Sequence, residues 1–187
     1  MALDEVVRRL HASAATTVLI DGRSGSGKST LATELSRSWA GSDVLRLDDV
    51  YPGWDGLWWA SEHIRSEVLE PRADGLPGRW RSWDWTAQRP GTWHDVEPDR
   101  RLVVEGVGAL TPDSRSLTDL AIWVDEDDAV RKRRALSRDG DGYLPHWERW
   151  AAQEDDFIAR CHPRRCADLI ATSVGHEFCF TATERTP

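Results

Sequence analysis

A phosphate-binding loop near the N-terminus constrains this chain more than any other feature. Residues 22–30 read Gly-Arg-Ser-Gly-Ser-Gly-Lys-Ser-Thr, which matches the pattern G-x-x-x-x-G-K-[ST]. The apolar run Thr17–Asp21 precedes the loop, and residues 31–35 after it have a helical pattern. The pattern binds nucleotide phosphates when it lies between a strand and a helix in this way. We therefore expect purine-nucleotide binding here.

The residues of this loop have distinct expected tasks. Lys28 is expected to reach the β- and γ-phosphates, and the Ser29 hydroxyl to ligate Mg²⁺. The main-chain N–H groups and the positive end of the following helix should attract the phosphates. A glycine-rich turn without a ligand is the alternative, but it leaves Lys28 and Ser29 unexplained. The predicted nucleotide-binding residues are Gly22, Ser24, Gly25, Ser26, Gly27, Lys28, Ser29 and Thr30.

Size and charge narrow the class of protein. The chain has 187 residues, and we expect one domain over 1–187. A net charge of −8 argues against a nucleic-acid partner, and no apolar stretch approaches the roughly 20 residues that span a bilayer. The N-terminus resembles an amphipathic helix, not a secretory signal. The odd set Cys161, Cys166 and Cys179 has poor zinc spacing, so we expect reduced thiols and a cytoplasmic protein, a monomer or a homodimer.

The order of apolar and amphipathic segments predicts the fold class. Strands alternate with helices, which is typical of a parallel sheet covered on both faces. We expect a three-layer α/β/α P-loop NTPase fold with a five-stranded parallel sheet and a helical lid. Residues 71–100 show no clean period and are expected to be irregular, and the tail 176–187 is either an edge strand or loose. Strands are expected at 17–21, 44–47, 102–105, 120–124 and 168–171, and helices at 28–39, 56–70, 127–139 and 145–160.

Acidic residues at the strand ends are candidates for the chemistry, because ligands of such sheets bind there. Glu105 ends a buried strand before a glycine and has the position of a metal-site acid; a turn-capping role is the alternative. Asp48 and Asp49 follow the second strand, and either carboxylate can act as a general base toward a substrate hydroxyl. We prefer Asp48, because it comes first after the strand; its alternative role is to cap or close the loop.

An arginine-rich helix follows the fourth strand. Arg131, Arg134 and Arg138 lie about one turn apart and share a side of the helix. In small P-loop kinases a mobile lid at this place carries arginines that stabilise transferred charge. A lid over about 127–145 is therefore predicted, with an ordinary solvated face as the alternative.

Tryptophan is abundant and clustered. The chain has 11 tryptophans against three phenylalanines, and six of the tryptophans lie between residues 54 and 85. They either fill the core or form an aromatic wall around an organic substrate. We predict an acceptor-binding segment at about 51–95.

With these motifs in order, the chain resembles the uridine kinase family of P-loop kinases. The resemblance covers about residues 16–172. After the phosphate-binding loop come Asp48-Asp-Val-Tyr51, Trp54-Asp55, Trp83-Asp84-Trp85 and Val104-Glu105-Gly106. Val124-Asp-Glu-Asp127, the three arginines with Asp139, and Pro163…Ala167-Asp168 follow. Each motif is weak alone, but their order and spacing together are specific.

The resemblance implies roles for particular residues. It implies that Asp48 is the catalytic base, that Asp55 holds sugar hydroxyls and that Glu105 serves the magnesium site. Arg131, Arg134 and Arg138 would contact phosphates and, with Lys28, complete the catalytic set. The expected acceptor-binding residues are Tyr51, Trp54, Asp55, Asp84 and Trp85.

One departure affects the expected acceptor. Pyrimidine-reading members of the family place a histidine where this chain has Gln88. We therefore expect a kinase that transfers the γ-phosphoryl group of ATP, with Mg²⁺, to a hydroxyl of a nucleoside-like small molecule. A P-loop kinase for another metabolite or for a nucleotide, and a nucleotide-dependent regulator without an acceptor, are the alternatives.

Overall fold

Five parallel strands form the centre of the structure. Their bounds are β1 Thr17–Asp21, β2 Ser42–Arg46, β5 Arg101–Glu105, β6 Leu120–Asp125 and β7 Leu169–Val174. The strands lie in the order β2-β5-β1-β6-β7. The computed structural model describes residues 1–175 and 177–183, and within them it leaves out the side chains of residues 139 and 141. The prediction of a five-stranded parallel sheet is confirmed.

A sixth strand extends this sheet at one edge. β8, Glu177–Ala182, pairs antiparallel with β7. Its outer side meets the N-terminus, where the Met1 amine donates a hydrogen bond of 2.7 Å to the Phe180 carbonyl. The tail thus forms the edge strand that was one of its two predicted alternatives. Residues 176 and 184–187 of the tail lie outside the described residues.

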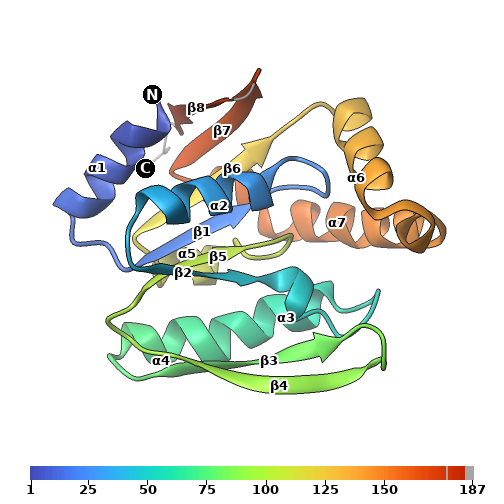
Figure 1. Cartoon of the computed structure of the whole chain (residues 1–187), viewed down its shortest axis with the longest axis horizontal. Coiled ribbons are helices and arrows are strands. Elements are labelled where there is room, and N and C mark those ends of the chain that lie inside the picture. The colour runs from blue at the N-terminus through green and yellow to red at the C-terminus, as the bar shows by residue number, and fades with distance from the viewer. Residues whose placement is uncertain (176, 184–187) are drawn as a thin grey trace.

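Helices cover both faces of the sheet (Figure 1). α1, Leu3–Ala12, and α2, Lys28–Ser38, pack on one face. Side chains alternate along a strand, so Val18 and Ile20 pack with these helices, whereas Leu19 belongs to the core of the opposite face. Every residue of β1 is buried. The loop after β1 is therefore held between two packed layers.

The opposite face carries the remaining helices. α3, Leu57–Ile64, continues through a π-helical turn into α4, Glu70–Ala73, and α7 spans Trp147–Cys161. The predicted helices at 56–70 and 145–160 are confirmed. Two short helices, α5 Pro112–Ser116 and α8 Pro163–Cys166, were not predicted. None of the described helices is both long enough and apolar enough to cross a membrane.

The prediction of an irregular segment at 71–100 was wrong. β3, Gly78–Asp84, and β4, Arg89–Val96, form an antiparallel hairpin. Trp80 stacks on His94 across the hairpin with the ring centroids 4.2 Å apart. Most hairpin residues are only partly buried or exposed. Because arginine and tryptophan take the places of alternating apolar and polar residues, the period of two that reveals a strand is missing.

The arginine-rich helix agrees with the predicted range 127–139. α6 spans Asp128–Tyr143, but its backbone is not helical at Gly140, where φ is 55°, so the regular helix ends before this residue and a short turn follows. The Asp127 carboxylate caps its first turn by accepting hydrogen bonds from the main-chain N–H groups of Ala129 and Val130. The strand arrowheads of β1 and β6 point toward the side of the molecule where α6 and α7 lie (Figure 1). The helix therefore lies beyond the carboxyl ends of the strands.

A buried arginine fastens α4 to the opposite end of the sheet. The Arg72 guanidinium is 7% exposed and donates to the carbonyls of Glu97, Arg100 (2.7 Å) and Thr16, and to the Thr17 hydroxyl. Thr16 and Thr17 lie at the start of β1, whereas Glu97 and Arg100 lie in the connection from β4 to β5. One side chain thus joins two connections of the chain.

We predict that Arg72→Met lowers the free energy of unfolding by about 3 kcal/mol, because it removes the hydrogen bonds that this buried guanidinium donates to three carbonyls and a hydroxyl. Urea unfolding followed by circular dichroism measures the change. Arg37→Met on the exposed side of α2 is the matched control and should change stability by less than about 0.5 kcal/mol. Equal stability of the two variants would contradict the prediction.

Candidate active site

The phosphate-binding loop lies at the carboxyl end of β1, and its glycines are required by its surroundings. Gly25 has φ 80°, and a Cβ at this position would overlap the main-chain carbonyl of Arg131 on α6. Gly27 has φ 103° at the start of α2. Both conformations belong to the left-handed region, which favours glycine. The loop therefore packs closely against the arginine-rich helix.

Lys28, Ser29 and Glu105 form a polar group below the loop, in which Lys28 and Glu105 are buried. Glu105 is 2% exposed, and the neighbouring Ser29 side chain favours the ionised form of its carboxyl group. Burial raises the pKa of Glu105, and the nearby Lys28 ammonium opposes this rise. Among the described residues, the Glu105 Oε1 atom has no hydrogen-bond partner, and the Arg46 Nε atom is 3.7 Å away from it.

These two oxygen-bearing side chains fit a magnesium ion. Mg²⁺ binds oxygen ligands, and it usually takes only one or two from protein while phosphates and water supply the others. A buried carboxylate oxygen without a partner, next to the Ser29 hydroxyl, is a suitable donor. Ser29 and Glu105 are thus the residues that would hold the metal.

The Asp21 side chain holds two segments of the main chain together. It is fully buried, and its carboxylate accepts hydrogen bonds from the main-chain N–H groups of Gly22 (2.6 Å), Gly108 and Leu110 (2.9 Å). Burial raises the pKa of Asp21 to about 7, although these hydrogen bonds and Lys28 lower it. The side chain joins the first residue of the phosphate-binding loop to the segment after β5.

A cavity of about 360 Å³ opens beside this loop. It brings together residues from the loop, from the segment after β2, from the hairpin, and from α6 and α7. Eight residues of the predicted site line it: Ser24, Lys28, Ser29, Asp48, Tyr51, Trp54, Trp85 and Arg138. Gly142, Tyr143 and Trp150 complete the lining and were not predicted. Phosphate-binding and acceptor-binding candidates thus share one space.

Aromatic rings form one wall of this cavity. Trp54 lies nearly parallel to Tyr143 and to His146, with centroid distances of 5.3 and 4.4 Å. Trp85 is tilted against Trp54 at 5.1 Å, and Trp150 meets Tyr51 edge-on at 4.7 Å. Rings from four separate segments therefore pack into one continuous wall.

The three predicted lid arginines lie in different surroundings. Arg138 lines the cavity. Arg131 is buried, and its Nε atom donates to Asp128 at 2.6 Å. Arg134 is half exposed and pairs with Glu126 at 2.6 Å. The structure thus brings one of the three to the cavity, and the phosphate contacts of all three remain a prediction.

Two predicted acceptor-binding acids lie outside the cavity lining. Asp55 is exposed and forms an ion pair with Arg149 of α7. Asp84 accepts hydrogen bonds from the main-chain N–H groups of Thr86 and Ala87, and so closes the hairpin turn. Both side chains are engaged within the protein. Their binding of an acceptor remains a prediction.

Sequence reasoning missed Glu154, which connects α7 to the phosphate-binding loop. This fully buried carboxylate accepts hydrogen bonds from the Ser24 N–H (2.9 Å), the Ser24 hydroxyl (2.6 Å), Arg23 and Trp150, and the Arg131 guanidinium lies 3.8 Å away. The signal was present in the helix pattern. Glu154 follows Trp150 by four residues and precedes Phe157 by three, so it lies on the apolar face.

Comparison with known proteins supports a family relationship. The chain is 30% identical over 139 residues to a uridine kinase of Ligilactobacillus salivarius, which covers 64% of each protein. It is 29% identical over 138 residues to a uridine kinase of Lactobacillus helveticus, covering 64% of this chain and 65% of that protein. The aligned part of the chain thus spans slightly less than two thirds of these relatives. No family model matches the chain.

The solved structures show the same fold. A possible uridine kinase from Bacillus stearothermophilus has a TM-score of 0.64 at 19% identity, over 90% of this chain and 96% of that one. A putative fructose transport system kinase from Silicibacter has a TM-score of 0.57 at 20% identity, over 89% and 95%. The fold is that of the P-loop kinases. The resemblance to uridine kinases, predicted from the order of the motifs, is confirmed.

The pKa of Asp21 makes stability depend on pH. Between about pH 4 and pH 7 this carboxyl is ionised in the unfolded chain and protonated in the folded one, so the free energy of unfolding should fall as pH rises. Asp21→Asn should flatten this slope, and chemical unfolding at several pH values measures it. Asp74→Asn, which removes an exposed carboxylate after α4, is the matched control. Identical slopes for the wild type and Asp21→Asn would contradict the prediction.

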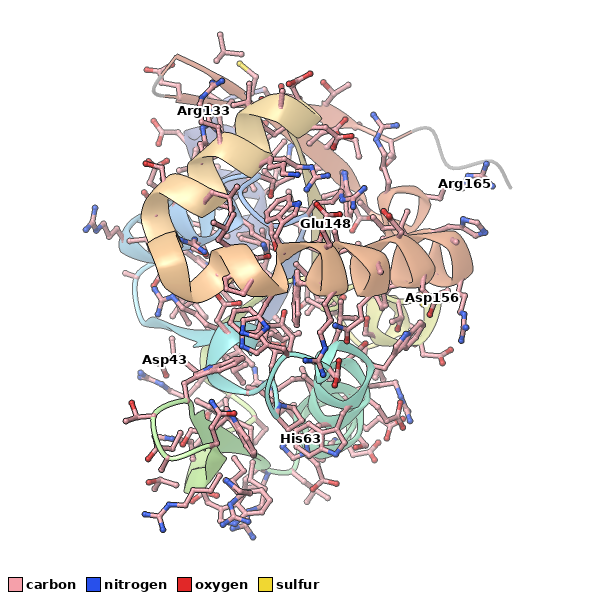
Figure 2. All side chains as sticks on the ribbon, turned by 90° about the vertical axis from the view of Figure 1, so that its right-hand side faces the viewer. Asp43, His63, Arg133, Glu148, Asp156 and Arg165 are labelled. Carbon is pink, nitrogen blue, oxygen red and sulfur yellow. The ribbon has the colours of Figure 1, made fainter. Side chains whose placement is uncertain are left out.

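We predict that Glu154→Gln lowers the free energy of unfolding by about 3 kcal/mol and raises the KM for ATP, because Arg23 and Arg131 lose their buried counter-charge and an NH2 donor replaces one of the two acceptor oxygens. Glu148→Gln is the control on the same helix. Glu148, which is labelled in Figure 2, is exposed and forms an ion pair with Lys132 of α6. Loss of this pair should change stability by at most about 1 kcal/mol. Thermal unfolding and ATP titration of both variants test this, and an unchanged Glu154→Gln would refute it.

Proposed function

We propose that this chain is an ATP- and Mg²⁺-dependent kinase that phosphorylates a hydroxyl of a nucleoside-like small molecule. The observation that carries the proposal is a shared cavity: Asp48 lines the same 360 Å³ space as Lys28 and Ser29. Phosphoryl transfer requires a base near the acceptor and cations near the phosphates. The names of the related uridine kinases support this reaction class.

The phosphate side of the cavity would bind ATP. The main-chain N–H groups of residues 25–29 and the N-terminal end of α2 favour negative charge, and Lys28 supplies a full positive charge. Ser29 and Glu105 would hold Mg²⁺, which, when bound, neutralises charge that develops on the phosphates. Together these residues orient the terminal phosphate toward the cavity.

Asp48 would act on the acceptor. The acceptor hydroxyl gives its proton to the Asp48 carboxylate as its oxygen bonds to the γ-phosphorus. The bond between the γ-phosphorus and the bridging oxygen breaks, and ADP leaves with that electron pair. Asp49 is the weaker candidate, because it does not line the cavity.

The helix α6 would serve as the lid. It contributes Arg138, Gly142 and Tyr143 to the cavity, so it covers the space between nucleotide and acceptor. A covered site excludes water and limits hydrolysis of ATP. We place the protein in the cytoplasm, which supplies ATP and keeps thiols reduced; all three cysteines are free.

Asp48→Asn should keep the affinity for ATP and lower kcat for phosphoryl transfer by about 100-fold or more, since it removes the proton acceptor and keeps the shape. A coupled ADP-release assay and an ATP-binding titration measure the two quantities. Turnover equal to that of the wild type would remove Asp48 from the proposed role.

Lys28→Ala is the contrasting variant. It should weaken ATP binding and turnover together, because the lysine charge acts on the bound phosphates as well as on the transferred group. If Asp48→Asn and Lys28→Ala show the same pattern in both measurements, the division between a phosphate side and an acceptor side is wrong.

A further inference from the structure

The side of the cavity that would bind the acceptor is lined mainly by aromatic rings. We propose that the acceptor is a flat, ring-bearing alcohol: its ring lies among the aromatic side chains, its single reacting hydroxyl lies at Asp48, and a sugar diol is not required for recognition. This inference rests on the proposed function, since it names the acceptor class of the same site. A nucleoside-like acceptor could be recognised by its ring or by its sugar, and this inference assigns recognition to the ring.

The first observation is that the wall consists of rings. Five of the eleven residues that line the cavity are aromatic, and they surround the space next to Asp48: Tyr51, Trp54, Trp85, Tyr143 and Trp150. Aromatic rings bind other flat rings by stacking or by edge contacts, beyond the effect of buried area. A flexible polyol gains little from such a surface.

The second observation is that four of the five side-chain donors of this wall are already used within the protein. The Trp85 indole N–H donates to the main-chain carbonyl of Asp48 at 2.9 Å, and the Trp150 indole N–H donates to Glu154 at 3.0 Å. The Tyr51 hydroxyl donates to the Val107 carbonyl at 2.7 Å.

Tyr143 completes this group, since its hydroxyl donates to the Ser24 hydroxyl at 3.0 Å. Ser24 in turn donates to Glu154. Four of the five donors of the wall therefore serve the protein and present ring surface to a ligand; the fifth, the Trp54 indole N–H, has no hydrogen-bond partner among the described residues.

The third observation concerns the polar side chains that would read a sugar. The Asp55 carboxylate is 66% exposed and lies in an ion pair with Arg149, outside the cavity lining. The Gln88 amide donates to the Trp85 carbonyl at 2.6 Å, and Asp84 caps the hairpin turn. Among the described lining residues, Asp48 is the single acid. The Asp48 carboxylate can accept the proton of the one reacting hydroxyl, and the described lining residues offer no second carboxylate for a sugar diol.

The decisive experiment compares a nucleoside with its 2′,3′-dideoxy analogue. Both have the same ring and the same 5′-hydroxyl, and they differ only in the diol. The coupled ADP-release assay is run with each, with ribose, and with 3-(hydroxymethyl)pyridine as a ring alcohol without a sugar. We expect kcat/KM for the dideoxy analogue within about 3-fold of the nucleoside, activity with the ring alcohol, and none with ribose.

Two results of this assay would overturn the proposal. One is a loss of about 100-fold or more on removing the diol, which is the behaviour of a site built to hydrogen-bond those hydroxyls. The other is a preference for ribose or another polyol over every ring-bearing acceptor. In both cases the proposed kinase function would stand.

A binding measurement separates failure of the inference from failure of the function. If no acceptor raises ADP release, the kinase proposal fails, and ligand-observed NMR then tests ring binding alone. Saturation transfer to 3-(hydroxymethyl)pyridine and not to ribose supports ring recognition, and the absence of transfer to either overturns it. Trp85→Leu should weaken this transfer severalfold. The matched control is Trp59→Leu, a half-exposed tryptophan outside the cavity lining, which should leave it unchanged.

Discussion

A single buried carboxylate holds the working parts of this molecule together. Glu154 lies on α7, yet three of its four hydrogen-bond donors come from the phosphate-binding loop, and its charge faces Arg131 of α6. A buried charge is tolerated only where it is paired and hydrogen-bonded. The loop, α6 and α7 therefore have to keep their positions relative to one another. Gly25 also packs against the Arg131 carbonyl, so the loop and α6 are in contact through their main chains as well. The loop after β1, the helix α6 and the helix α7 therefore form one unit.

The aromatic wall depends on this unit. Tyr143 reaches Ser24 from the end of α6, and Trp150 reaches Glu154 from within α7. The rings that border the acceptor side are thus oriented by the same hydrogen bonds that orient the phosphate side. A substitution at Glu154 is expected to disturb both halves of the cavity, whereas Trp85, which is held by the Asp48 carbonyl, lies outside this network.

Much of the fold could be predicted because its signals are local. The loop Gly22–Thr30 and the apolar strands carry patterns that burial on both faces imposes. The hairpin β3–β4 was missed because its strands are stabilised by ring and guanidinium contacts, such as that of Arg79 with Trp93, and not by alternating burial. Glu154 was missed because an acid on an apolar helix face has no meaning until its partners, 130 residues away in sequence, are known.

For the candidate site, the sequence predicted which segments lie near the cavity better than it predicted which side chains face it. Asp48, Trp54 and Arg138 were named from motif order and do border the cavity. Asp55 follows the same motif, yet its carboxylate pairs with Arg149, because the chain direction after Trp54 carries it to the surface. Sequence order predicts which segment approaches a site. Which side chain of that segment faces inward depends on its tertiary contacts.

The anchored rings have a consequence for the thermodynamics of binding. A tryptophan whose N–H is bound to the protein has already lost its rotational freedom on folding, so little entropy remains to be lost when a ligand arrives. Trp85 and Trp150 are anchored in this way, and Tyr143 is anchored by its hydroxyl. The cavity is thus preorganised, and a small, rigid ligand can bind it without the ordering cost that a flexible pocket would impose.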